Sequence, residues 1–394
     1  MNAKTNGILV FTSLVVILLV LVFTAKQGLP EPDAQSVGYA SDTVEAQVVE
    51  ILEEGTTQMG KITQAYQIVK IRILDGDYQN ETLQIDHGKR QLRPDGFTLK
   101  LHDHVLVTVG VSPEGKLEAY FVDYVRRQSL LILVGIFIIG SFLISGWKGL
   151  RSVLSIGISL VVILYYIMPR ILAGDDPILA SLIGSVLFLA LTQYLIYGWT
   201  LKTQLALAGI TGSVIVTGFL SVWFVNYAYL SGFGDENAMY LMQAAGNINI
   251  RNLLVASIII GTLGVLDDLV IGQSSAVIEL HIANPALSFR QRFTSAMNIG
   301  RDHVAATVNT LVLAYLGASM SMFLLFSINQ VNLGSMLNID YIAEEIVRSL
   351  VGTLGLFTAV PITTFLACLA VNTPERIKKL TRIFGPLTDS THRH

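Results

Sequence analysis

Two adjacent acids, Asp267 and Asp268, interrupt an apolar stretch at residues 253–280 that is long enough to cross a membrane. A second charged pair, Arg301 and Asp302, stands at the start of the next apolar stretch. An ionisable side chain in hydrocarbon costs about 2.5–3.5 kcal/mol on insertion scales, so such residues usually serve a function. Carboxylates in such a place can bind a cation or exchange a proton. These residues therefore predict a polar pathway through a membrane.

On a helix over residues 253–280, small and polar residues recur at three- and four-residue steps and share one face. These residues are Gly261, Gly264, Asp268, Gly272, Ser275 and Glu279. Small residues let membrane helices approach closely, so we predict that the glycines pack and that the acids and Ser275 line the path. Asp267 points about 100° away from Asp268. Alternatively, Asp268 only bonds a neighbouring helix, or both aspartates cap a broken half-helix.

The following stretch, residues 303–327, contributes further candidates. The pathway candidates are Arg301, Asp302, Asn309, Thr310 and Tyr315, and the packing candidates are Gly300 and Gly317. Polar groups this deep in an apolar stretch need partners. Alternatively, Arg301 only anchors the membrane boundary, and Asp302 is a first-turn acid favoured by the helix dipole. Glu344 and Arg348, four residues apart, are predicted to pair on the last helix.

Composition excludes several classes of protein. Of 394 residues, 52% are hydrophobic and 14% are charged, whereas soluble proteins carry about 25% charged residues. The net charge of −3 gives no reason to expect a nucleic-acid partner. Cys368 is the single cysteine, so a disulfide within one chain or a cysteine metal site is excluded. Without HExxH, Walker, Rossmann or serine–histidine patterns, we expect no metal, no cofactor and no enzyme activity.

Eight apolar runs predict about eight transmembrane helices. The first lies within residues 1–27 and is interpreted as a retained anchor, with cleavage as a signal peptide as the alternative. The other seven form the predicted bundle over residues 128–371, followed by a tail at 372–394. Their ranges are 128–146, 152–168, 178–197, 204–226, 253–280, 303–327 and 342–371.

Between the anchor and the bundle, a linker at 28–41 precedes a polar region at 42–127 that is rich in β-branched residues and turn signals. About five short strands of this kind predict a small closed or half-closed β-barrel of OB-like or SH3-like type. We expect this domain to have a structural role or to contact a protein partner. The predicted fold class is thus an all-α polytopic membrane bundle with an inserted β-barrel-like domain.

Basic residues predict the orientation of the bundle, because loops rich in lysine and arginine stay in the cytoplasm. Lys4, Lys148, Lys202, Arg290 and the basic part of the tail all fall on one side of the predicted bundle. Both termini are therefore predicted to be cytoplasmic, and the β domain is predicted to be extracytoplasmic.

Residues 261–280, 297–302 and 308–317 resemble the YibE/F family of bacterial multi-pass membrane proteins. The matching motif residues are Gly261, Gly264, Asp267, Glu279, Gly300, Arg301, Asp302, Asn309, Thr310 and Tyr315. In architecture the resemblance extends over roughly residues 44–371. It implies a location in the bacterial cytoplasmic membrane, a transport role, and an acid at the position of Asp267. It carries over no catalytic residues.

The leading functional hypothesis is a transporter or permease component that couples to H⁺ or cation movement through its carboxylates. The expected partners are the lipid bilayer and a small ion or solute. The alternative hypothesis is a membrane scaffold or signalling protein whose β domain docks a protein partner.

Overall fold

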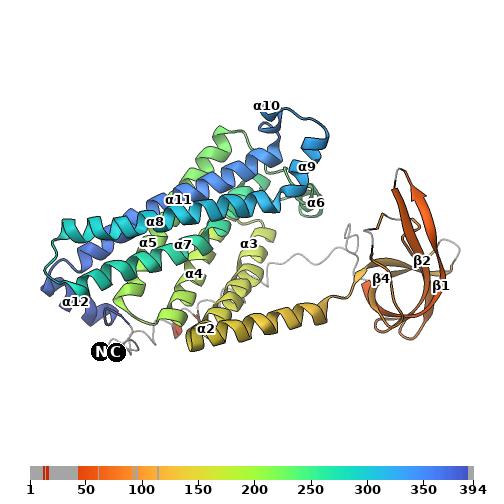
Figure 1. Ribbon diagram of the computed structural model, residues 1–394, viewed down its shortest axis with the longest axis horizontal. Coiled ribbons are helices and arrows are strands. Elements are labelled where there is room, and N and C mark those ends of the chain that lie inside the picture. Colours follow the sequence, from red (N-terminus) through yellow and green to blue (C-terminus); the bar gives the residue numbers. More distant parts are fainter. Residues whose placement is uncertain are drawn as a thin grey trace. The chain divides into compact units, whose positions relative to one another are not determined.

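The computed structural model describes residues 12–13, 15–16, 43–60, 62–90, 92–93, 96–112 and 115–388. The chain divides into two compact units, a β unit within residues 32–140 and a helical unit that continues from residue 141 (Figure 1). The predicted anchor at 1–27, apart from the four positions given above, and the predicted linker at 28–41 lie outside the described residues.

The β unit is one antiparallel sheet with the strand order β3-β2-β1-β4-β5. The strands are β1 (Thr43–Met59), β2 (Ile62–Ile73), β3 (Thr82–His87), β4 (His104–Val111) and β5 (Leu117–Tyr124). The alternation of β2 explains how the sheet forms its core, because Val69 and Ile71 are buried while Lys70 between them is exposed. The five predicted strands are confirmed. The predicted closed barrel is not confirmed, because β3 and β5 remain the edges of the sheet.

Side chains connect the two edge strands where ladder hydrogen bonds do not. The Nε2 atom of His87, at the end of β3, lies 3.0 Å from the hydroxyl oxygen of Tyr124 on β5. The His87 ring also packs edge-on against Phe121, with a centroid distance of 4.3 Å. Burial is the main cause that lowers the pKa of His87 below its ordinary value. Burial therefore disfavours the charged form of this imidazole in the folded unit.

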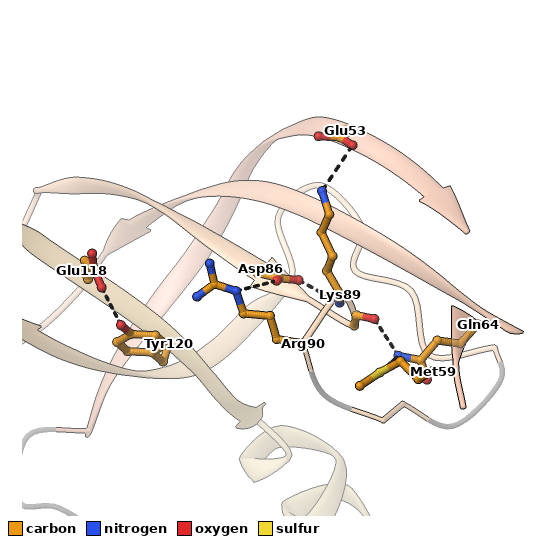
Figure 2. A network of polar contacts seen from close by, with 9 residues as sticks. Glu53, Met59, Gln64, Asp86, Lys89, Arg90, Glu118 and Tyr120 are labelled. Carbon is orange, nitrogen blue, oxygen red and sulfur yellow. Dashed lines mark hydrogen bonds and ion pairs between the residues drawn. The ribbon is translucent and has the colours of Figure 1, made fainter. Parts of the chain in front are cut away.

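Ion pairs lie on the exposed surface of the β unit (Figure 2). Lys89 reaches Glu53 at 3.8 Å, and Arg90 reaches Asp86 at the same distance. Exposed pairs of this kind stabilise a fold by about 0–1 kcal/mol each. The apolar inner face, rather than these pairs, must hold the sheet together.

Twelve consecutive helical elements follow the sheet in the described chain, and the first of them begins within the β unit and continues into the helical unit at residue 141. They are α2 (Arg127–Val162), the π-helical turn η1 (Ile163–Ile167), α3 (Met168–Leu172), α4 (Pro177–Tyr197), α5 (Leu201–Tyr227), α6 (Glu236–Ala244), α7 (Ile250–Ala283), α8 (Phe289–Ala318), α9 (Met320–Ile328), α10 (Leu333–Met336), α11 (Asp340–Ala370) and α12 (Pro374–Phe384).

The described residues contain five helices that are long and apolar enough to cross a membrane, or six if α8 and α9, bent by 60°, form one span. The eight predicted spans are therefore not confirmed. Runs 128–146 and 152–168 were predicted as two spans with a loop between them, but helix resumes directly after a break at Gly146. Its φ of 57° is a conformation that glycine adopts without strain. The first predicted run lies outside the described residues, apart from its four described positions.

Helix α7 occupies the centre of the bundle and packs against α4, α5, α8 and α11 (Figure 1). Its buried residues cover most of its circumference and include Ile258, Ile259, Leu263 and Leu266, while one stripe that contains Gly261, Gly264 and Gly272 is exposed. A long helix that is apolar over most of its circumference suits a membrane span. Outward, the bundle exposes large apolar side chains such as Phe219, which suits a lipid bilayer.

Side-chain caps fix where the site-bearing helices begin. Asp176 accepts from the backbone N–H groups of Ile178 and Leu179 at the start of α4. Ser288 and Gln291 form a reciprocal capping box at the start of α8. These caps set the register of the residues that follow on each helix.

We expect the β unit to become less stable as the pH is lowered, because burial lowers the pKa of His87. The unfolded chain binds a proton below about pH 6.5, whereas the folded unit resists it. The unfolded state then binds more protons, so the contribution of His87 is present above pH 6.5 and is lost as pH falls through the folded pKa. Hydrogen exchange of the β-unit amides in the full chain, corrected for intrinsic rates, would show weaker protection at pH 5 than at pH 7.5.

The matched control for this prediction is a second histidine. His87→Gln should flatten the pH dependence of protection, whereas His104→Gln, at an exposed position on β4, should leave it in place. Equal pH dependence in both variants would contradict the assignment to His87.

Candidate functional site

Asp267 lies near the end of the bundle where α4 turns into α5. Helix α4 has 21 residues, which makes it about 31 Å long, close to the thickness of the hydrocarbon layer. Gln193, one turn before the end of α4 at Tyr197, donates its side-chain amide to the Asp267 carboxylate. The aspartates in the middle of α7 are therefore at the level of the last turn of α4.

A second bond confirms this level. The Ser274 hydroxyl on α7 donates to the backbone carbonyl of Lys202, in the first turn of α5, at 3.0 Å. The part of α7 after Ser274 consequently extends past the α4–α5 turn. Glu279 lies in that extension and is exposed.

The surroundings of the two aspartates differ. Asp267 is half-buried, and its partner Gln193 is fully buried. The Gln193 carbonyl oxygen, Oε1, is buried without a hydrogen-bond partner among the described residues. The side chain of Asp268 is 79% exposed, with Oδ2 4.0 Å from Nε2 of His303 on α8. The chain thus holds one acid inside the bundle and presents the other at its surface.

The predicted stripe on α7 faces outward for most of its length. Gly261, Gly264, Asp268, Gly272 and Glu279 are exposed, and Ser275 is half-buried. A Cβ atom at Gly264 would meet nothing within 4 Å, whereas one at Gly261 would lie 3.5 Å from the Tyr315 hydroxyl. At Gly272 it would lie 3.8 Å from the His303 ring. Parts of α8 therefore lie along the stripe without closing over it.

The α8 candidates are mostly exposed. Arg301 donates to the Asn298 side chain at 3.3 Å, and Thr310 bonds back to the Ala306 carbonyl at 3.2 Å. Asp302 and Asn309 are exposed, and Tyr315 is half-buried. Between α7 and α8, the structure brings Asp268 next to His303. In the described chain, no hydrogen bond or ion pair links either aspartate to Arg301, Asp302 or Asn309.

The packing candidates on α8 fall into two kinds. At Gly300, a Cβ atom would lie 2.5 Å from Val360 and 2.8 Å from the Gln273 side chain, so α8 meets both α7 and α11 there. At Gly317, a Cβ atom would meet nothing within 4 Å. Gly300 therefore has the close contact expected of a packing glycine, and Gly317 has open space.

Three residues outside the predicted set prove central to this region: Gln193, Gln273 and His303. Gln273 is buried and donates to Thr364 on α11 at 2.6 Å and to the Ala296 carbonyl on α8 at 2.8 Å. It therefore joins three helices. The signal in the sequence is an amide within an apolar run, which has the same requirement for partners as a buried acid.

Acids also gather at the opposite end of the bundle. Glu344 was predicted to pair with Arg348, and that prediction is wrong. Arg348 instead pairs with Glu345 at 3.2 Å and donates to Ser257 on α7 at 2.8 Å. Glu344 turns away and accepts from the backbone N–H of Gly234 at 3.2 Å, because the loop before α6 needs an acceptor for that amide.

Two grooves border α8 on its α11 side. The larger, of about 450 Å³, is lined by Met297, Arg301, Val304, Ala305, Val308, Phe357, Val360 and Pro361. The smaller, of about 170 Å³, lies near Tyr315 and Glu345. No group of three or more histidine, cysteine or acidic side chains that could hold a metal ion occurs among the residues the structure describes.

Comparison with known proteins places this region in context. A family model described as YibE/F-like protein matches residues 133–373, more than half of the chain. No curated protein and no solved structure matches the chain. The matched range includes α4, α5, α7, α8 and α11, and therefore both aspartates.

We expect Gly300→Ala to destabilise the helical unit, because the added methyl group would overlap Val360 and Gln273. Overpacking of this kind costs about 1–3 kcal/mol. The measurement is the midpoint of thermal unfolding of the purified protein in detergent. Gly317→Ala, on the same helix but with open space at Cβ, should leave the midpoint unchanged or raise it slightly. Equal losses from both variants would contradict the packing assignment.

Proposed function

This chain belongs to the YibE/F-like family, as the motifs around Asp267 and Arg301 predicted, and on that basis we propose that it is a transporter or permease component of the bacterial cytoplasmic membrane. The five or six apolar helices identify an integral membrane protein. The proposed activity is movement of a small ion or solute, coupled to H⁺ or another cation through Asp267.

The observation that carries this proposal is the environment of Asp267. Its carboxylate is half-buried on the central helix and accepts a hydrogen bond from the neutral amide of Gln193. Among the described residues it forms no ion pair. A carboxylate in apolar surroundings without a basic partner is stabilised by taking up a proton or a cation. Asp267 is thus suited to load and release a positive charge.

Gln193 can serve both states of that acid. Its Nε2 amide donates to the charged carboxylate. Its Oε1 atom has no hydrogen-bond partner among the described residues. Rotation of the amide would present that oxygen to a protonated acid, which is a donor. One neutral side chain would then satisfy Asp267 before and after protonation, and the helices would not need to repack.

The glycine stripe of α7 provides the proposed route. Ser257, Gly261, Gly264 and Asp268 follow one another at steps of three and four residues and so lie in line along the helix. At one end of this line, Arg348 donates a hydrogen bond to Ser257. At the other end, His303 lies beside Asp268. The open space at Gly264 leaves room beside the helix between them.

The proposed orientation places the α4–α5 turn in the cytoplasm. Lys202 lies at this turn, and the basic helix α12 packs against α5. Cytoplasmic loops carry the excess of lysine and arginine. In this orientation Asp267 opens towards the cytoplasm. The proposal that the β unit is extracytoplasmic further requires that residues 127–145 and 147–172 cross the bilayer separately, on either side of the break at Gly146.

Gradient-driven flux in proteoliposomes tests the proposal. An imposed pH or Na⁺ gradient should drive ion movement through the wild type, and Asp267→Asn should reduce it to background, because an amide cannot exchange a proton or balance a cation. Glu375→Gln, an exposed carboxylate on α12, is the control and should retain wild-type flux. Unchanged flux with unchanged pH dependence in Asp267→Asn would exclude Asp267 as the coupling site.

A specific observation supports the scaffold alternative. The β unit has a pocket of about 280 Å³ at the seam between its edge strands, lined in part by His87, Arg93, Phe97 and Tyr124. Aromatic and arginine side chains are enriched at protein-binding sites. If the protein is a scaffold, deletion of residues 43–124 should abolish its cellular activity, whereas Asp267→Asn should be mild. Flux from protein lacking the β unit would exclude this alternative.

A further inference from the structure

Helix α8 exposes an unusual face for a membrane bundle. Of its 30 residues, the buried ones are Arg292, Ala296, Gly300 and Leu311. Its outward face carries Asp302 and Asn309, which the other helices of the unit leave uncovered. Polar groups that face lipid are costly because hydrocarbon offers them no partners. Asp302, next to His303, lies at the level of the last turn of α4, and Asn309 lies about two turns deeper, so a partner that covered this face would shield Asn309 from lipid.

The spacing along the outward face matches a coiled-coil seam. The residues are Asn298, Asp302, Ala305, Asn309, Val312 and Leu316, at alternating steps of four and three. Five of them are exposed and Val312 is half-buried. Alternation of three- and four-residue steps is the a/d pattern by which two helices pack side by side. In this frame Asp302 and Asn309 occupy a positions, and Ala305 occupies a d position.

We propose that a second copy of this chain covers this face, with the two α8 helices packed in parallel along the seam. The uneven distribution of lysine and arginine between the two ends of the bundle gives each copy the same orientation in the bilayer. A twofold axis along the bilayer normal then brings equal residues together at equal depth. The small side chain of Ala305 permits close approach of the two helices at the centre of the seam.

Charge complementarity selects a second copy as the occupant. In a parallel coiled coil, an a side chain inserts into a hole formed by d, g, a and d residues of the facing helix. For Asp302 that hole consists of Asn298, Arg301, Asp302 and Ala305 of the other copy. The Arg301 guanidinium of each copy thus meets the Asp302 carboxylate of the other, and the symmetry makes two such pairs. These pairs offset the repulsion between the two facing Asp302 carboxylates.

Within the described chain, neither Arg301 nor Asp302 has an ion pair to lose on association. Arg301 donates a 3.3 Å hydrogen bond to the Asn298 side chain. The apolar run at residues 5–25 contains no ionisable side chain, so it has no charged group that could pair with Asp302.

The seam and the proposed route lie on different sides of α8. His303 follows Asp302 directly and so points about 100° away from it, towards Asp268 on α7. Pairing through Asp302 would leave Asp268 uncovered. The inference goes beyond the proposed function and does not depend on it, since two copies can associate whether or not they move an ion.

Disulfide cross-linking of the full chain in native membranes tests the inference. Ala305→Cys places a thiol at the centre of the seam, and oxidation with copper phenanthroline should give a covalent dimer. Ala314→Cys is the matched control, because it is an exposed alanine on the same helix, turned by about 180°. The wild type, whose single Cys368 is buried, should give no dimer. No dimer from Ala305→Cys, or equal yields from both positions, would overturn the proposal.

Charge reversal tests the cross-pairing in the Ala305→Cys background. Arg301→Asp and Asp302→Arg should each lower the cross-linking yield several-fold, because each leaves like charges facing one another. The double reversal should restore the yield. Single reversals that leave the yield unchanged would overturn the Arg301–Asp302 pairing. Selective cross-linking without gradient-driven flux would leave this inference standing and remove the transport proposal.

Discussion

Hydrogen bonds from α7 to its neighbours hold the helical unit in register. In hydrocarbon, apolar helices gain little by exchanging lipid contacts for one another, so polar bonds and close packing decide how they associate. Helix α7 bonds α4 through Asp267 and Gln193, α8 and α11 through Gln273, and α5 through Ser274. These bonds cluster towards one end of the bundle. The acid proposed to load a cation therefore belongs to the same polar layer that aligns the helices.

Close packing supplies the second constraint, and glycine positions show where it acts. A Cβ atom at Gly209 would overlap Thr363, and one at Gly355 would overlap Thr217, so α5 and α11 meet almost backbone to backbone. Gly300 has the same role between α8 and its two neighbours. By contrast, the space at Gly264 is open. The bundle is thus tight around α5 and α11 and loose along the outer stripe of α7, where a pathway needs room.

The β unit follows a different physical logic. Its core forms from the inward residues of alternating strands, and its charged residues pair on the exposed face, where such pairs contribute little. The two edge strands, β3 and β5, form no ladder hydrogen bonds with each other. An aromatic cluster around His87 connects them instead. The contact between β3 and β5 holds the histidine from which we predict the pH dependence of the unit, and a pocket lies there as well.

The sequence by itself determined the classes of element, because hydropathy and periodicity are local properties. The alternation of Val69, Lys70 and Ile71 predicts a half-buried strand, and the apolar run around Asp267 predicts a membrane helix. The motif near Arg301 also identified the family. The tertiary structure alone decided which groups meet. Gln193 lies 74 positions from Asp267, and no local pattern gives the helix packing that joins them.

The same distinction between local and tertiary information explains why the predicted loop near Gly146 and the predicted Glu344–Arg348 pair were wrong. Two apolar runs do not reveal that helix resumes directly after Gly146, because hydropathy records neither a backbone angle nor a loop. Glu344 and Arg348 have the spacing of an ion pair, but the amide of Gly234 competes for Glu344, and that amide arrives from a distant loop. On α8, the sequence determined that Asp302 lies on a polar face. Only the packing of the other helices decided that this face stays uncovered, because burial depends on which neighbours reach a surface.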